Sequence, residues 1–360
     1  RGVTTLAVSK PGVPLLAAER AARITLSDIT LDGGMLEIGG EANALVALTS
    51  CPDILINGLS VTASAGRGLS LTSCGGRVQR SEFSLIGDAA VSAIDSTGLD
   101  ITDNKITECG NNGIQIWRSS AGEDGSIISR NRISRIDARA GGSGQNGNGI
   151  NVFRAGSVLV EGNRITDCAY SAVRGNAASN IQILSNSCQR IGEVALYAEF
   201  GFEGALICGN LVDGAAAGIS VTNFDVGGRL AVVQGNLVRN LKRREHEPVD
   251  KRGEGISVEA DASVTGNTIE NAPTAGIVIG WGRYMRDVIA TGNLIRQARV
   301  GIAVSSDSAA GACLITSNMI SGTPEGAIRA MDLGRVHGPD LAREHVATSG
   351  RVVIENNMAV

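Results

Sequence analysis

Aromatic residues, proline and lysine are scarce in this 360-residue chain. Aromatic residues make up only 3 % of it, proline occurs 7 times, and the only lysines are Lys10, Lys105, Lys242 and Lys251. The formal net charge is −4, so the basic stripe that nucleic-acid binding requires is missing. No apolar run approaches the roughly 20 residues of a membrane-spanning helix. We therefore expect neither a nucleic-acid partner nor a membrane span.

Glycine, by contrast, is abundant at 48 residues, and apolar residues reach 43 % of the chain, which is too much for a disordered protein. The pattern Ile-x-x-Asn-x-Ile recurs along the chain, mostly at intervals of about 23–26 residues, which is a solenoid period. Asn57 and Ser81 fit the same position in two upstream copies. The asparagines of the later copies are Asn104, Asn131, Asn163, Asn186, Asn210, Asn236, Asn267, Asn293, Asn318 and Asn356.

A second motif, Gly-Ile-x-Val, lies between the asparagines, for example at 113–116 and 149–152. Its alternation predicts short strands, and the glycine and asparagine clusters around it predict turns. Short strands could also build a sandwich or a barrel, but neither explains one asparagine at one fixed position. In a parallel β-helix the same position stacks about 4.8 Å away on the next coil, so the amides can form a ladder and the isoleucines a core. The sequence therefore predicts an all-β, single right-handed parallel β-helix domain over 1–360, with about 12 coils.

The cysteines do not follow the spacing of a metal site, because no Cys-x-x-Cys pattern occurs among the seven. Cys51 and Cys74 occupy equivalent positions one coil apart, so a disulfide is geometrically feasible, although we favour two buried reduced thiols. Cys109 and Cys168 share another position but lie two coils apart, out of reach of each other. The histidines are too scattered for a histidine metal site: His246, His337 and His345.

Functional residues in a solenoid are expected where the repeat is broken, and the outward positions of the Gly-Ile-x-Val strands are not uniform. Aromatic rings can stack on sugar faces, and arginines can bind acidic groups with two hydrogen bonds. Inserts at 137–148 and 242–254 fall at the same turn and are expected to wall a groove, whereas an insert at 333–349 is expected to cap the C-terminal end. The predicted substrate-binding residues are Trp117, Arg118, Asn151, Phe153, Arg154, Phe200, Asn223, Asp225 and Trp281.

The sharpest chemical hypothesis is a lyase or epimerase that acts on an acidic polysaccharide. Such a reaction needs a cation beside the sugar carboxylate, a base for the neighbouring proton and an acid for the leaving oxygen. Arg174 could neutralise the carboxylate, and Tyr197 could act as acid or base. The other predicted catalytic residues are Glu199 and, on the second insert, His246 and Lys251.

Three alternatives stay open for these residues. Asn176, Glu199 and Asp225 could form an oxygen-only calcium site. Glu199 and Asp225 could instead be the carboxylate pair of a glycoside hydrolase. Arg174 and Glu199 could also be a purely structural ion pair between coils.

From about Ser27 onward, the chain closely resembles a family of Tat-translocated bacterial repeat proteins. The resemblance implies a pectate-lyase-like β-helix that is exported folded to the periplasm or beyond, with its twin-arginine signal expected upstream of Arg1. It supplies no catalytic residues, and the motifs associated with polygalacturonases and alginate epimerases do not occur. The segments that carry it are "NNGIQIWRSSAGEDG", "GGSGQNGNGINVFRAG", "CAYSAVRGNAASNIQI", "GEVALYAEFGFEGA", "GISVTNFDVGGRLAVVQGN" and "ENAPTAGIVIGWGRYMRDV".

The sequence thus favours an exported lyase or epimerase whose partner is an acidic polysaccharide or a cell-envelope glycan. A non-catalytic glycan-binding or envelope scaffold protein would use the same groove without an acid/base pair. A purely structural or adhesive solenoid would show uniform outward columns, which this sequence does not have.

Overall fold

The structure is a computed structural model that describes residues 4–243, 253–343 and 351–360. These residues form a right-handed parallel β-helix of about 13 coils, as the sequence predicts. They contain no helix, and so none that could cross a membrane. The chain divides into two compact units, Arg1–Gln182 (unit 1) and Ile183–Val360 (unit 2), and each is described by itself.

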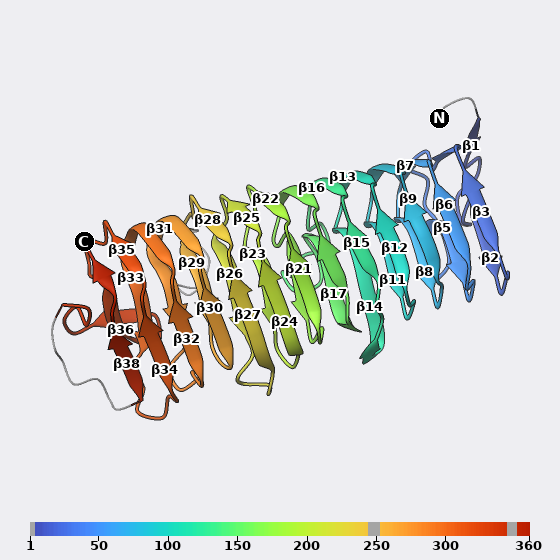
Figure 1. Cartoon of the computed structure of the whole chain (residues 1–360). Coiled ribbons are helices and arrows are strands. Elements are labelled where there is room, and N and C mark those ends of the chain that lie inside the picture. The colour runs from blue at the N-terminus through green and yellow to red at the C-terminus, as the bar shows by residue number, and fades with distance from the viewer. Residues whose placement is uncertain (1–3, 244–252, 344–350) are drawn as a thin grey trace. The chain divides into compact units, whose positions relative to one another are not determined.

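Each coil contains up to three short strands. The first strand follows the asparagine position, the second carries the Gly-Ile-x-Val motif, and the third leads to the next asparagine. Each pairs in parallel with the equivalent strand of the next coil, as Ile106 with Ile133 and Ile114 with Ile150. Within each unit the strands of successive coils therefore lie side by side (Figure 1).

The described part of unit 1 contains seven first strands and seven second strands. Its first strands are β1 (Thr5–Ala7), β4 (Thr30–Asp32), β7 (Ser60–Ser64), β10 (Glu82–Ile86), β13 (Lys105–Cys109), β16 (Arg132–Ile136) and β19 (Arg164–Cys168). Its second strands are β2 (Leu16–Glu19), β5 (Ala44–Thr49), β8 (Arg67–Thr72), β11 (Ala89–Ile94), β14 (Asn112–Glu123), β17 (Asn148–Gly156) and β20 (Val173–Asn176). Its third strands are β3 (Ile24–Ser27), β6 (Ile54–Asn57), β9 (Gly76–Gln79), β12 (Leu99–Thr102), β15 (Ile127–Ser129) and β18 (Leu159–Glu161), and β21 (Ile181–Leu184) spans the division.

Unit 2 repeats this order, with two strands long enough to serve as both first and second strand, β31 (Thr268–Ile279) and β33 (Leu294–Ser305). Its other first strands are β22 (Ser187–Gln189), β25 (Leu211–Asp213), β28 (Leu237–Arg239), β35 (Met319–Ser321) and β39 (Met358–Ala359). Its other second strands are β23 (Val194–Glu199), β26 (Ala217–Thr222), β29 (Glu254–Val258) and β36 (Ile328–Asp332). Its third strands are β24 (Glu203–Cys208), β27 (Arg229–Gln234), β30 (Ala262–Thr265), β32 (Val288–Thr291), β34 (Cys313–Thr316) and β38 (Val352–Glu355).

The last second strand is covered at its edge. β37 (Arg335–His337) pairs with β36 in antiparallel orientation, and the Asp340 carboxylate accepts hydrogen bonds from the Ala327 and Ile328 amides at 2.9 and 3.0 Å. The described part of the insert 333–349 thus shields an edge that would otherwise be open to pairing with another chain.

The asparagine ladder is confirmed. In unit 1 the Asn131 side chain is fully buried, and its Oδ1 accepts hydrogen bonds from the Asn104 backbone amide and side-chain amide, both at 3.0 Å. Its Nδ2 donates to the Ile101 carbonyl at 2.9 Å and to Asn163 Oδ1 at 3.0 Å. Both polar side-chain atoms of Asn131, which forms one rung of the ladder, therefore have hydrogen-bond partners, as burial of an amide requires. The same pattern recurs in unit 2 along Asn186, Asn210, Asn236, Asn267, Asn293 and Asn318.

Two expected members of the ladder are wrong. The rung before Ser81 is Leu59, whose amide donates to Ser81 Oγ, whereas Asn57 lies two residues earlier and pairs with Gln79. At the other end Asn357, not Asn356, accepts from the Asn318 amide. Both errors are register slips in motif copies whose flanking residues are degenerate.

The core is built from isoleucine ladders beside the asparagines. Ile106, Ile133 and Ile165 are in register on successive coils and fully or almost fully buried. Gly149, in the Gly-Ile-x-Val motif, makes room for them, because a Cβ there would lie 2.6 Å from Ile165 Cγ2 and 2.7 Å from the Ala172 carbonyl oxygen. The motif glycine is therefore set by packing against the ladder.

Gly149→Ala is expected to lower the free energy of unfolding by about 1–3 kcal/mol, the usual range for overpacking a well-filled core. Urea denaturation measures the change. Gly144→Ala is the control, since a Cβ there meets nothing within 4 Å. Equal stability of the two variants would contradict this view of the core.

All seven cysteines are free thiols, in agreement with the favoured prediction for Cys51 and Cys74. Ile136 separates Cys109 from Cys168 in the parallel register, so these two do not meet. Burial raises the pKa of the Cys109 thiol to about 12, which keeps it protonated and unreactive.

Candidate functional site

In unit 1 the outward positions of the second strands carry an aromatic and arginine cluster. Trp117 on β14 and Phe153 on β17 are in register, with their ring centroids 6.2 Å apart and the rings inclined by 69°. The Arg154 guanidinium lies 4.7 Å from the centroid of the Phe153 ring. Both rings are half-buried, so part of each remains open to solvent. The predicted juxtaposition of Trp117, Phe153 and Arg154 is thus present in unit 1.

Hydrogen bonds fix the turn beside this cluster. Arg154 Nη1 donates to the Ser119 carbonyl at 3.0 Å. The Ser119 hydroxyl and amide in turn donate to the Asp95 carboxylate at 2.6 and 2.8 Å. These two hydrogen bonds lower the pKa of Asp95, because they stabilise its charged form.

The Asp95 contacts give a pH dependence with a defined sign. Because the pKa of Asp95 is lower in the folded chain than its unfolded value of about 3.9, its contribution is present above about pH 4 and is lost as pH falls through the folded pKa. Asp95→Asn is expected to remove up to about 1 kcal/mol at neutral pH, since the group is partly exposed. Urea denaturation at about pH 6 and about pH 3 should show a smaller loss of stability for the variant than for the wild type. Identical pH profiles would contradict the role of Asp95.

The insert 137–148 lies over the outward face of unit 1 and does not stand away from it as a wall. Asn151 Nδ2 donates to the Gly144 and Gln145 carbonyls at 3.2 and 3.3 Å, and Arg174 Nη1 donates to the Ser143 carbonyl at 2.5 Å. The same Asn151 accepts from Trp117 Nε1 at 3.3 Å. Arg174 and Asn151 are therefore buried under the insert and hold it in place.

Arg118 differs from the other arginines of unit 1. Its Nε and Nη1 atoms are buried and, within the described residues, have no hydrogen-bond partner. Its charge lowers the pKa of the neighbouring Asp124 carboxyl, but the larger effect of burial leaves that pKa raised.

In unit 2 a hollow of about 340 Å³ is lined by Phe224, Asp225, Arg283, Tyr284 and Ala309. Phe224 and Asp225 follow β26, Arg283 and Tyr284 lie in the turn after β31, and Ala309 follows β33. Three of four successive coils, those of β26, β31 and β33, thus contribute residues at the same turn, beyond the carboxyl ends of the second strands.

The side chains of this hollow are arranged around two rings. The centroids of the Phe224 and Tyr284 rings lie 5.6 Å apart, and the rings are inclined by 64°. Arg283 lies 5.1 Å from the Tyr284 centroid and its Nη2 donates to the Tyr284 hydroxyl at 3.3 Å. Arg286 lies 4.8 Å from the Phe224 centroid and forms a two-fold ion pair with Asp261 at 2.9 and 2.7 Å. Arg283, which is exposed, is therefore the cation available to a ligand here.

Backbone contacts hold the loop that carries Phe224. The Asn223 side chain is buried and exchanges two hydrogen bonds with the Ala260 backbone, at 2.7 and 3.1 Å. The Asn223 and Phe224 amides both donate to the Glu259 carboxylate, at 2.8 and 3.1 Å. Asn223, predicted to bind substrate, thus positions the loop and is not open to solvent.

The remaining predicted residues of unit 2 differ in accessibility. Tyr197 and Glu199 on β23 are only 4 % and 1 % exposed, whereas the next residue, Phe200, is 42 % exposed. Trp281 is half-buried and begins the turn that carries Arg283. A soluble polymer can reach Phe200, Trp281 and Asp225 directly, but not the Tyr197 and Glu199 side chains as they stand.

His246 and Lys251, the predicted catalytic residues of the insert 242–254, lie outside the described residues. Asn176 belongs to unit 1, whereas Glu199 and Asp225 belong to unit 2. Within residues 4–243, 253–343 and 351–360, no three His, Cys, Asp or Glu side chains are grouped so that they could hold a metal ion.

Phe224, Arg283 and Tyr284 were not among the predicted site residues. The signal is present in "TNFD" and "WGRYMRD", which place an aromatic residue and a charge just past the end of a Gly-Ile-x-Val strand. Asp225, which is among the predicted residues, lies in the same hollow. The turn residues around it do not repeat from coil to coil, so the strand pattern gives them no register.

Comparison with known proteins supports the fold. The family described as right-handed β-helix region matches residues 67–227 and 146–295. A double mutant of the periplasmic alginate epimerase AlgG superposes with a TM-score of 0.52 at 10 % identity, over 93 % of this chain and 77 % of that one. PfbA, a surface adhesin of Streptococcus pneumoniae, gives a TM-score of 0.52 at 11 % identity, over 92 % and 84 % of the two chains. At such identities the likeness concerns the fold alone, and no curated protein gives a significant sequence match.

Proposed function

This chain belongs to the right-handed β-helix family, and from that premise we propose that it is an exported protein that binds an acidic polysaccharide. The proposed binding site is the hollow of Phe224, Asp225, Arg283 and Tyr284 in unit 2. Export follows the resemblance to Tat-translocated proteins, and it agrees with the neighbouring folds of a periplasmic protein and a surface adhesin.

The observation that carries this proposal is the combination of two ring faces with an exposed guanidinium in one hollow. Aromatic rings present a flat apolar surface to the carbon face of a sugar, and tyrosine adds a hydroxyl for hydrogen bonding. The Arg283 guanidinium can donate two parallel hydrogen bonds to a sugar carboxylate. In unit 1, Trp117, Phe153 and Arg154 offer the same types of group.

A matched pair of polymers tests the proposal. Isothermal titration should detect binding to polygalacturonate and much weaker binding to fully methyl-esterified polygalacturonate, which has the same backbone without the charge. Binding should weaken as salt is added, because the interaction between exposed charges is screened. Equal affinity for the two polymers, or no binding to a panel of acidic polysaccharides, would refute it.

Elimination or epimerisation of the bound uronate is a second candidate function, favoured by the Asp225 carboxylate and the Tyr284 hydroxyl in the same hollow. Arg283 would neutralise the sugar carboxylate and so acidify the adjacent C–H, and Asp225 would accept that proton. In a lyase the Tyr284 hydroxyl would protonate the departing glycosidic oxygen. New ultraviolet absorbance from unsaturated uronate ends, lost in Tyr284→Phe but with binding retained, tests this chemistry, and its absence on every polyuronate excludes the lyase.

The sequence-based assignment of Arg174, Tyr197 and Glu199 as catalytic residues stays a prediction, as does the calcium site of Asn176, Glu199 and Asp225. Burial of the first three in the structure requires their cover to open before a substrate could reach them. The hydrolase hypothesis pairs Glu199 with Asp225. The Glu199 side chain is buried, whereas Asp225 is exposed. Tyr197→Phe is the informative variant, because loss of turnover without loss of stability would restore this assignment.

A further inference from the structure

A column of cationic side chains crosses three successive coils of unit 1. Lys105, Arg132 and Arg164 are the first residues of β13, β16 and β19, and they are in register with one another. All three are exposed. Equivalent residues on neighbouring strands lie about 4.8 Å apart, so the three charges form a regularly spaced row.

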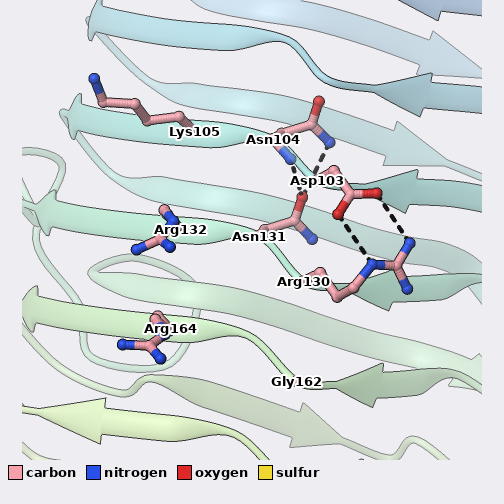
Figure 2. Close-up of a pocket in the computed structure, with 8 residues that line it drawn as sticks. All are labelled: Asp103, Asn104, Lys105, Arg130, Asn131, Arg132, Gly162 and Arg164. Carbon is pink, nitrogen blue, oxygen red and sulfur yellow. Dashed lines mark hydrogen bonds and ion pairs between the residues drawn. The ribbon is translucent and has the colours of Figure 1, made fainter.

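The row lines a hollow of about 370 Å³ at the asparagine turn, and Figure 2 shows its three cationic side chains one coil after another. The hollow is also lined by the buried asparagine rungs and by the Asp103–Arg130 ion pair. Arg130 donates to both Asp103 oxygens at 2.9 Å, so its charge is already matched. The three residues of the row are the remaining cations of the hollow.

No acidic side chain among the described residues forms an ion pair with this row, although Glu82 lies in register beside Lys105 at its end. The side chains of Lys105, Arg132 and Arg164 form no ion pair or hydrogen bond there, whereas most other arginines of unit 1 pair with an acid. Like charges directly opposite on adjacent strands repel each other. The row therefore opposes folding and is explained by an anionic ligand that relieves the repulsion.

A column of hydroxyls runs beside the cations on the same outward face. Thr107, Ser134 and Thr166 are two residues further along the same strands and share their register. Ser134 Oγ lies 3.2 Å from Thr107 Oγ1. Thr107 is buried, whereas Ser134 and Thr166 are half-buried, so the coils of Arg132 and Arg164 each offer one cation and one hydroxyl.

We propose that this face, the cation row, binds a linear acidic polysaccharide whose anionic groups follow successive coils from Lys105 towards Arg164. A sugar unit in an extended chain is about as long as the strand spacing, so consecutive charges can meet consecutive cations. Glu82 precedes Lys105 in the column and ends the row, because it would repel the polymer. The site lies on first strands of unit 1 and is separate from the hollow of the proposed function.

The chemistry of the face favours a polysaccharide over a nucleic acid. Single-stranded nucleic acids are bound by basic grooves with aromatic side chains on which the bases stack. No aromatic residue lines this hollow, and the chain as a whole carries a net charge of −4. Carboxylate or sulfate groups need only the guanidinium, ammonium and hydroxyl donors that are present.

The test replaces the three cations by serine, the residue that the same column holds at Ser60. All variants of this test carry the background substitution Arg283→Ala, which disables the proposed binding site in the unit 2 hollow. The result therefore does not depend on whether that proposed site binds a polysaccharide. Titration with polygalacturonate and heparin oligosaccharides should show binding that Lys105→Ser, Arg132→Ser and Arg164→Ser together weaken about tenfold or more. The loss should be small for Arg132→Ser alone. The control removes the same charge from the ion-paired Arg20, Arg23 and Arg77.

Each outcome decides the proposal. Selective loss in the row variant, with the control variant unchanged, supports it, and tighter binding of one oligosaccharide shows whether the row prefers a sulfated chain or one with carboxylates alone. An equal loss of affinity in both variants would mean that the affinity depends only on the net charge of the protein, and would overturn the proposal. No binding in the background protein, or equally tight binding of a single-stranded oligonucleotide of the same charge, would also overturn it. A thermal unfolding temperature of the row variant equal to or above that of the background protein excludes a folding defect as the cause of its loss.

Discussion

Asn131→Ala is expected to lower the free energy of unfolding by about 3–5 kcal/mol, the largest effect of any single substitution considered for stability. The substitution removes the Asn131 acceptor of the Asn104 backbone and side-chain amides and the Asn131 donor to the Ile101 carbonyl. It leaves Asn163 Oδ1 with only the backbone amide of residue 131. All of them lie in a region that water does not reach. Buried polar groups without partners retain the cost of desolvation, and that cost, together with the lost contacts, sets the magnitude.

Asn57→Ala is the matched control, because it removes the same side-chain atoms from a residue outside the ladder. Asn57 accepts a hydrogen bond from Arg80 at an exposed position, so the loss should stay below about 1 kcal/mol. Urea denaturation followed by circular dichroism measures both variants. If the two lose equal stability, the amide ladder does not support the fold as described.

Arg283→Ala is expected to weaken binding of an acidic oligosaccharide by about 10- to 100-fold, the effect of losing one charge-assisted contact. The guanidinium is exposed at the rim of the unit 2 hollow and lies against the Tyr284 ring. Its hydrogen bond to the Tyr284 hydroxyl and the nearby acidic Asp225 raise its pKa, so it stays cationic at any working pH. The variant should also show a weaker salt dependence than the wild type.

Arg229→Ala is the control for this prediction, since it removes the same charge from an exposed third-strand residue of unit 2 that pairs with Glu203. Calorimetric titration of the two variants under one set of conditions separates a local effect from a change in net charge. A similar affinity loss in both would contradict a carboxylate contact at Arg283.

The fold follows from the sequence because a solenoid repeats its physical constraints at every coil. A buried asparagine and an isoleucine recur at fixed positions, and each copy must satisfy the same hydrogen bonds and fill the same space. The slips at Asn57 and Asn356 occur where that constraint is weakest, in a leucine rung and in the last coil. A displacement of two residues at Asn57 and of one at Asn356 changes the motif little there.

The candidate site is less predictable because its residues lie on turns, which do not repeat. The outward columns correctly bring Trp117, Phe153 and Arg154 together, since strand register fixes which residues are neighbours. They give no information about what a turn or an insert does to an outward side chain. Arg174 illustrates this, because an insert more than 25 residues away in sequence covers it, as its contact with Ser143 shows.

Hydrogen exchange of the wild-type chain with and without a uronate oligosaccharide tests the central claim most directly. If the polysaccharide binds in the unit 2 hollow, the backbone amides of the loop 223–227 and the turn 281–286 should gain protection in the wild type but not in Arg283→Ala. Protection that spares both segments, or that persists in Arg283→Ala, would place the binding site elsewhere.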